Sequence, residues 1–385
     1  MNEFIKKNME YNLPVIVSII LMIVLLLLPT GYEDAQIYQG TDRCTARVLE
    51  VDNSAIISTG LIKSGEQGCK VELLGGRFKG QIAHAYNMLN GSLELDKIFE
   101  PGDKALVVIS YKDDSILSIN MIDHYRVDKE LILSLLFVVA LILFAGKTGV
   151  RAMLSFIVTV LMIWKVLIPG FLRGQNPVIL GLMITIALTV TIIALVYGFS
   201  LRTLSAASGA VLGVITTAVL GSIFTDAFRI HGAVMSFSES LLYAGHADLN
   251  LTQIFMASIF IGSSGAVMDL AVDITASIHE VVQKKPDIQW KEAALSGIRV
   301  GRAAMGTMTT TLLLAYSGGY IALLMVFMAQ GTPIYNILNL KYVSAEILHT
   351  MVGSIGLVTV APFTAITSGF LLTNRRKPSV ESQSQ

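Results

Sequence analysis

Long apolar runs dominate the chain and predict helices that cross a membrane. A run of about 20 apolar residues spans the hydrocarbon layer as an α-helix. Runs near or above this length lie at 13–30, 130–147, 150–168, 178–198, 203–224, 251–279, 304–329 and 343–372. The pattern therefore predicts an α-helical multi-pass membrane protein with about eight transmembrane helices.

Between the first two runs the pattern changes to short, alternating stretches that are typical of strands. These stretches lie at 45–51, 70–74, 105–111 and 116–122, with turn residues at 75–76 and 101–103. They predict a small all-β domain that resembles an OB fold. The predicted domains are an anchor helix at 1–30, the β-domain at 31–128, a seven-helix bundle at 129–373 and a tail at 374–385.

Composition and charge support a membrane protein and argue against a nucleic-acid partner. Hydrophobic residues make up 53% of the chain and charged residues 15%, which no single soluble core accommodates. The formal net charge is zero, and no basic patch with interleaved aromatic residues is present in the sequence. The lipid bilayer is the first predicted partner.

Lys and Arg in the short connections predict the orientation, because cytoplasmic loops hold an excess of both. With the N-terminus inside, the inner side holds Lys6, Lys7, Lys147, Arg151, Arg202, Lys284, Lys285, Lys291, Arg299, Arg302, Arg375, Arg376 and Lys377. The outer side holds only Lys165, Arg173, Arg229 and Lys341. This bias predicts that both termini are cytoplasmic and that residues 31–128 are extracytoplasmic.

The sixth apolar run carries two carboxylates, which are costly inside a bilayer unless they are used or neutralised. Gly265, Asp269 and Asp273 recur every four residues and share one helix face. Arg299 and Arg302 begin the next run at the same depth. Two interpretations stay open: an Arg-paired structural clasp, or a carboxylate that carries a proton or ion.

The eighth run repeats this polar pattern at the opposite membrane surface. Glu346 and His349 lie one turn apart on one helix side, where a carboxylate and an imidazole can share a proton near neutral pH. A satisfied packing histidine is the alternative. Thr307 and Thr310 add hydroxyls in the seventh run, although such hydroxyls also bond back to their own helix.

Glycine and proline residues predict interruptions in the last three runs. Broken helices near the midplane form the substrate sites of many secondary transporters. The predicted breaks lie at Gly262, Gly265, Gly318, Gly319, Gly353, Gly356 and Pro362. With the polar residues above, they predict a pathway through Asp269, Asp273, Arg302, Thr307, Thr310, Glu346 and His349.

Three separated motifs resemble the YibE/F family of bacterial multi-pass membrane proteins. They lie at 265–269, 301–316 and 353–357. The resemblance also extends to 80–81 and 101–103 of the β-domain and implies a bacterial cell membrane, but it implies no biochemical activity. The family pattern often has an acid after the Gly–Arg pair and an amide in the Thr run, where this chain has Ala303 and Thr310.

Two cysteines and several weak enzyme motifs complete the sequence. Cys44 and Cys69 both lie in the predicted β-domain and form either a disulfide or two packed thiols; they are too few for a metal site. The zinc-protease-like start at His279 lacks the second His. An intramembrane serine protease built on Ser264 and His349 is a remote alternative, because their predicted depths differ.

We therefore expect an ion- or proton-coupled permease without catalytic residues, cofactor or metal, whose solute is a small molecule or ion. The alternative is a non-transporting scaffold or sensor whose β-domain binds an envelope protein. A second copy of the chain, in a homo-oligomer, is a further candidate partner.

Overall fold

The computed structural model describes residues 2–32 and 40–374 and consists of two compact units. One unit comprises Met1–Thr30 with Ala145–Gln385, and the other comprises Gly31–Phe144. The second unit contains the β-domain and the first part of the helix that begins at Val127, and the predicted boundary at 128 stays a prediction. The predicted tail, with Arg375, Arg376 and Lys377, lies outside the described residues apart from Asn374.

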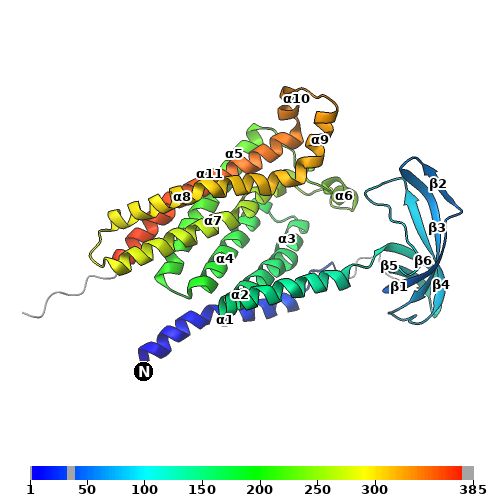
Figure 1. Ribbon diagram of the computed structural model, residues 1–385, viewed down its shortest axis with the longest axis horizontal. Coiled ribbons are helices and arrows are strands. Elements are labelled where there is room, and N and C mark those ends of the chain that lie inside the picture. Colours follow the sequence, from blue (N-terminus) through cyan, green and yellow to red (C-terminus); the bar gives the residue numbers. More distant parts are fainter. Residues whose placement is uncertain (1, 33–39, 375–385) are drawn as a thin grey trace, which may run out of the picture. The chain divides into compact units, whose positions relative to one another are not determined.

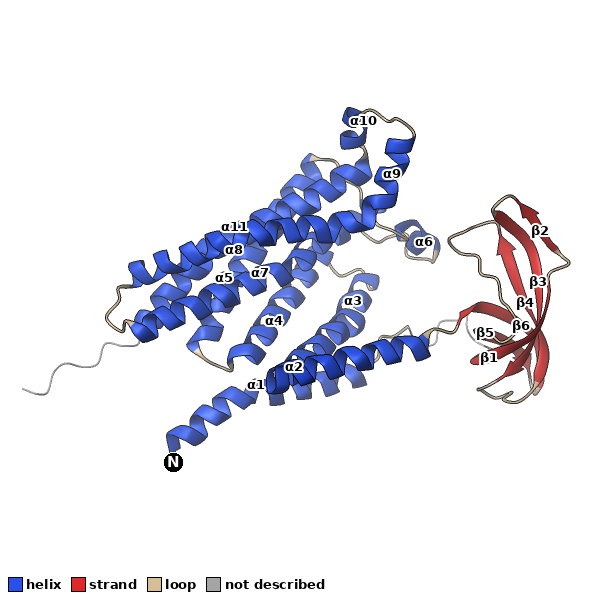
Figure 2. Ribbon diagram, in the orientation of Figure 1, coloured by secondary structure: helices blue, strands red, loops and turns tan. Residues whose placement is uncertain are grey.

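The β-domain is a small closed barrel (Figure 2). Its strands are β1 Thr41–Asp52, β2 Ile56–Thr59, β3 Ile62–Leu73, β4 Ile82–Asn90, β5 Lys104–Lys112 and β6 Ser115–His124. Five strands follow the order β1-β5-β6-β4-β3, and pairing of β1 with β3 closes the sheet, while β2 pairs only with β3 as a hairpin. β4 and β6 pair in parallel, and the other pairs are antiparallel.

Both cysteines are free thiols in the barrel core, so the disulfide interpretation is wrong for this structure. Cys69 is paired across the sheet with Val51, which lies further along β1 than Cys44. At about 3.3 Å per residue the separation of Cys44 from Val51 is roughly 23 Å along the strand, well beyond disulfide reach. Burial raises the pKa of the Cys69 thiol to about 11 and also raises that of Cys44.

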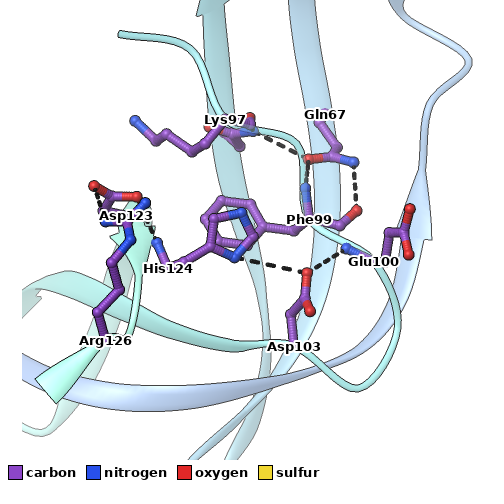
Figure 3. Close-up of polar contacts among 9 residues, drawn as sticks. Gln67, Lys97, Phe99, Glu100, Asp103, Asp123, His124 and Arg126 are labelled. Carbon is purple, nitrogen blue, oxygen red and sulfur yellow. Dashed lines mark hydrogen bonds and ion pairs between the residues drawn. The ribbon is translucent and has the colours of Figure 1, made fainter. Parts of the chain in front are cut away.

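A buried amide ties the barrel to the loop before β5 (Figure 3). The Gln67 side chain, which is fully buried, donates to the Phe99 carbonyl at 2.9 Å and accepts from the Phe99 N–H at 3.0 Å. Asn87 donates to the same Gln67 oxygen at 3.0 Å. The Phe99 ring also contacts His124, with ring centroids 4.6 Å apart. Both polar atoms of the Gln67 amide and both backbone groups of Phe99 therefore have partners, whereas Asn87 Oδ1 has none among the described residues.

The rest of the chain is almost entirely helical (Figure 1). The α-helices are α1 Asn2–Leu27, α2 Val127–Met162, α3 Ile168–Leu172, α4 Pro177–Tyr197, α5 Leu201–Ala227, α6 Ser238–Tyr243, α7 Leu251–Lys284, α8 Trp290–Ser317, α9 Ile321–Ala329, α10 Ile334–Asn339 and α11 Lys341–Thr373. A π-helical turn, η2 Ile163–Leu167, joins α2 to α3, and 3-10 turns lie at η3 Gly232–Val234 and η4 Gly318–Tyr320. Asn176, Ser200 and Asn250 cap α4, α5 and α7, as their side chains accept N–H bonds of the first turns.

Within residues 2–32 and 40–374, six helical stretches are long and apolar enough to cross a membrane. The predicted multi-pass helical architecture with a small β-domain is therefore confirmed, whereas the count of eight spans is not. The predicted runs 130–147 and 150–168 belong to one stretch, Val127–Leu172, and the first run gives an apolar helix of only Tyr11–Leu27.

Close helix contacts at glycines hold the centre of the bundle together. A Cβ at Gly356 of α11 would overlap the Thr217 hydroxyl of α5, and one at Gly209 of α5 would overlap the Thr364 hydroxyl. Only glycine permits these approaches.

Two of the three predicted groups of helix breaks are wrong. α7 is continuous through Gly262 and Gly265, and α11 is continuous through Gly353, Gly356 and Pro362. Most of these glycines permit helix contact instead: a Cβ at Gly353, for example, would meet Ser263 of α7 at 3.1 Å. At Gly318 and Gly319 the α-helix does give way to the turn η4.

Candidate functional site

The predicted site residues lie on α7, α8 and α11, which pack against one another within one unit. α8 runs antiparallel to α7, since Gly297 and Gly301 of α8 lie against Ile278 and Ile274 of α7. Near its other end α8 places Tyr316 against Gly262. This pairing puts the carboxylates of α7 and the basic residues of α8 at matching levels, as expected from the sequence.

No arginine clasp forms, however. Asp269 and Asp273 are exposed on the face of α7 that points away from the core, and Arg299 and Arg302 are exposed on α8. Within residues 2–32 and 40–374 no ion pair joins either carboxylate to an arginine. A carboxylate that faced hydrocarbon would cost about 2.5–3.5 kcal/mol, so this face of α7 requires water or protein beside it.

The threonine hydroxyls of α8 are used locally. Thr307 donates to the Ala304 carbonyl at 3.0 Å, and Thr310 donates to the Gly306 carbonyl at 3.3 Å. Both residues are exposed. The structure therefore keeps their hydroxyls on their own helix, which is the simpler of the two predicted uses.

Glu346 and His349, by contrast, are brought together with a third polar side chain, Tyr316 of α8. The Tyr316 and His349 rings stack with centroids 4.3 Å apart and planes inclined by 29°. Glu346 lies one turn before His349 on α11, and all three side chains are only partly exposed. We call Tyr316, Glu346 and His349 the α8–α11 polar cluster.

Each member of this cluster has a buried polar atom without a partner. The Tyr316 hydroxyl oxygen, Glu346 Oε1 and His349 Nε2 make no hydrogen bond to any residue that the structure describes. An unsatisfied buried polar atom costs about 1–3 kcal/mol, so a dry cluster would cost roughly 3–9 kcal/mol. A site of this kind is expected to hold water or an ion.

Gly262 of α7 forms the third wall of the cluster. A Cβ at this position would lie 3.0 Å from the Tyr316 hydroxyl oxygen and 3.1 Å from His349 Nε2. The missing side chain therefore lets these two polar atoms reach the α7 backbone. About three helical turns further along α7, Asp273 lies on the same exposed face of the helix as Gly262.

The imidazole of His349 is held by its stacking on the Tyr316 ring, and its Nε2 atom has no hydrogen-bond partner among the described residues. A neutral imidazole nitrogen accepts or donates a hydrogen bond according to the tautomer. The cluster thus offers the carboxylate oxygen Glu346 Oε1, the imidazole nitrogen His349 Nε2 and one hydroxyl that both donates and accepts.

These atoms suit a proton, a water molecule or a small hydrogen-bonding cation better than a metal ion. No group of three or more His, Cys, Asp and Glu side chains is close enough to hold a metal within the described part of the chain. The serine-protease alternative also lacks support: the Ser264 hydroxyl donates to the Ile261 carbonyl at 2.7 Å, and His349 lies against Gly262 instead.

Sequence reasoning found Glu346 and His349 but assigned no role to Tyr316 and misread Gly262 as a break. The sequence marks Tyr316 in two ways: it ends the 301–316 motif of the family resemblance, and it is a phenol in an otherwise apolar segment just before the Gly318–Gly319 pair. Its stacking on His349 depends on the packing of α8 against α11, which no local pattern encodes.

Comparison with known proteins identifies the family. The model of the YibE/F-like protein family matches residues 133–374, which include the whole of α7, α8 and α11 but not the barrel. The comparisons with curated proteins and with solved structures found no match. Because the match covers more than half of the sequence, this integral membrane protein belongs to the YibE/F-like family.

Proposed function

We propose that the chain is a proton- or ion-coupled permease whose pathway runs along α7 between α8 and α11. The observation that carries the proposal is the α8–α11 polar cluster, with its three buried and unpartnered polar atoms. A proton or hydrated ion that visits these atoms would satisfy them. A purely structural helix junction would have no use for them.

The exposed face of α7, with Gly262, Gly265, Asp269 and Asp273, would continue the pathway from this cluster. Nothing lies within 4 Å of a Cβ built at Gly265, one turn beyond Gly262. Asp269 follows on the same face, about 10 Å along the helix from Gly262. Carboxylates without fixed cations can take up and release a proton, so Asp269 and then Asp273 would act as the next carriers.

We further propose eight crossings with both termini cytoplasmic in a bacterial cell membrane. The stretch Val127–Leu172 contains 46 residues, or about 69 Å of helix, more than twice the hydrocarbon thickness of about 30 Å. Gly146 within it has non-helical torsions of φ 54° and ψ −126°. A turn at Gly146 would divide the stretch into two crossings, and α1 would add the eighth.

For the barrel we propose an OB-type domain on the extracytoplasmic side that acts as a sensor or lid. The order β1-β5-β6-β4-β3, closed by β1 and β3 with a parallel β4–β6 pair, supports this fold assignment. The fold alone names no ligand.

The scaffold remains the second candidate because of apolar side chains on the β2–β3 hairpin. Leu61 and Ile57 are 83% and 66% exposed there. Exposed apolar residues of this kind mark protein contacts in soluble domains. An envelope protein that binds this hairpin would give the chain a role that needs no transport.

Transport by reconstituted protein separates these candidates. Proteoliposomes with a trapped pH-sensitive dye would report proton movement under an imposed gradient. Asp269→Asn should abolish the flux while the protein stays folded. Asp287→Asn, the same substitution in the exposed α7–α8 connection, should leave it unchanged. If the unmodified protein moves neither protons nor any of a panel of ions and small solutes, the permease is refuted and the scaffold is favoured.

A further inference from the structure

A pocket of about 800 Å³ opens at the opposite end of the bundle from the polar cluster. It lies where α4 ends, α5 begins, and α7 and α11 approach their ends. Its polar wall includes Arg202 of α5 and His279 of α7. Its other walls are mainly apolar and are formed by Val190, Phe199, Leu201, Leu204, Val282 and Leu372. This volume lies within the range of small-molecule sites.

The guanidinium of Arg202 is half-buried and has no hydrogen-bond or ion-pair partner within the described chain. It lies over the Tyr197 ring, whose centroid is 5.1 Å from the guanidinium carbon. An arginine carries five N–H donors, so a half-buried one without an acceptor lacks its usual counterpart.

Arg151, at the same end of the bundle, shows how this fold satisfies an arginine that needs no ligand. Its guanidinium donates to the Leu195 carbonyl at 3.3 Å and to the Tyr11 carbonyl and the Asn12 side chain at 3.1 Å each. It also lies over the Tyr11 ring, 3.6 Å from the centroid. The contrast indicates that the acceptors for Arg202 come from outside the chain.

The chemistry of the walls restricts what supplies those acceptors. Arginine pairs best with a phosphate or carboxylate, which its planar fork contacts through two bonds. Leu204, Phe199 and Val190 expose apolar surface beside it, where a soluble anion would gain nothing. Lys284 and Lys285 at the end of α7 do not line the pocket and pair with Glu280 and Glu292, so Arg202 is the basic group that an anion in the pocket would meet. Basic pockets between membrane helices bind anionic lipid head groups.

We propose that this pocket binds the phosphate group of an anionic phospholipid, with Arg202 as its principal partner and the apolar walls along its acyl chain. The helix start of α5 is not itself the anion site, since the Ser200 side chain already accepts the Thr203 N–H. The site is independent of the proposed transport pathway, because it shares no residue with the α8–α11 polar cluster.

Native mass spectrometry of the full-length protein released from nanodiscs tests this site. The nanodiscs would contain phosphatidylcholine with a minority of phosphatidylglycerol. The unmodified protein should retain phosphatidylglycerol selectively, and Arg202→Gln should weaken that retention at least about tenfold. Arg202→Lys, which keeps the charge but loses the fork, should weaken it less. Arg299→Gln removes an exposed basic residue that does not line the pocket and should have no effect.

A second arm replaces the lipid by inorganic phosphate and measures thermal stabilisation in detergent. The proposal is supported if lipid retention depends on Arg202 while phosphate does not stabilise the protein through Arg202. Stabilisation by phosphate alone would overturn the lipid assignment in favour of a soluble anion. Equal phosphatidylglycerol retention by the unmodified protein and a folded Arg202→Gln or Arg202→Lys variant would overturn the site altogether.

Discussion

Replacing Gly262 by alanine should damage the polar cluster, whereas the same change one turn away should not. The new methyl group would lie 3.0 Å from the Tyr316 hydroxyl oxygen and 3.1 Å from His349 Nε2, closer than ordinary contact. Stacking between Tyr316 and His349 restricts how far either ring can retreat. Overpacking of this kind costs about 1–3 kcal/mol. At Gly265 nothing lies within 4 Å, so Gly265→Ala meets no clash.

Both substitutions gain the same helix propensity of up to about 1 kcal/mol, so their difference isolates the clash. We expect Gly262→Ala to be less stable than Gly265→Ala by about 1–3 kcal/mol and to lose proton flux, while Gly265→Ala keeps both properties. Reversible unfolding in mixed micelles measures the first difference, and dye-loaded proteoliposomes measure the second. Equal stability and equal flux in the two variants would refute the placement of Gly262 against the cluster.

Three further predictions concern the barrel. Gln67→Leu leaves the Phe99 N–H and carbonyl without their partner and should destabilise the barrel by about 2–6 kcal/mol, visible as faster amide hydrogen exchange in the full-length protein; unchanged exchange would contradict the role of this amide. The backbone N–H groups of Asn90 and Ser92 lower the pKa of Asp96, so the ionised carboxylate stabilises the barrel above the unfolded pKa of about 3.9 and loses this effect as the pH falls through the folded pKa. Asp96→Asn should therefore flatten the fall of the melting temperature with acid. An unaltered pH profile would contradict this role of Asp96. Cys44 and Cys69 are free thiols, and burial raises the pKa of Cys69 to about 11. Protein prepared without reductant should therefore keep the same melting temperature and gel mobility when a reductant is added. A shift on adding reductant would show a disulfide.

Most of the architecture was predictable because each element carries its own periodic signal. Continuous apolar runs predict membrane helices, and alternation with turn residues predicts the barrel. The count of eight spans stays a prediction, because the runs 130–147 and 150–168 form one helical stretch in which only Gly146 has non-helical torsions. The apolar part of α1 is also shorter than an ordinary span.

The glycines show where local reasoning ends. A glycine lowers helix propensity whether it breaks a helix or admits a neighbour, so Gly262 and Gly353 give the same signal in both cases. Only the packed partners, Tyr316 and Ser263, distinguish the two. Because these partners come from another helix, the sequence around each glycine does not reveal them.

The candidate site was predictable in part for the same reason. Glu346 and His349 lie one turn apart on one helix, so their proximity follows from helical spacing. Tyr316 joins them only through the packing of α8 on α11. Arg302 and Asp273 were expected at one level, which the α7–α8 pairing supports, but spacing alone could not show that both side chains are exposed rather than paired.

The central claim is that the α8–α11 polar cluster is a solvated site that protonates, and a density map at a resolution that shows ordered water tests it most directly. We predict density about 2.6–3.2 Å from the Tyr316 hydroxyl oxygen, Glu346 Oε1 and His349 Nε2, the distances of hydrogen-bonded water or a small cation. A map in which these three atoms pack against apolar side chains, with no density between them and no path to water, would contradict the account.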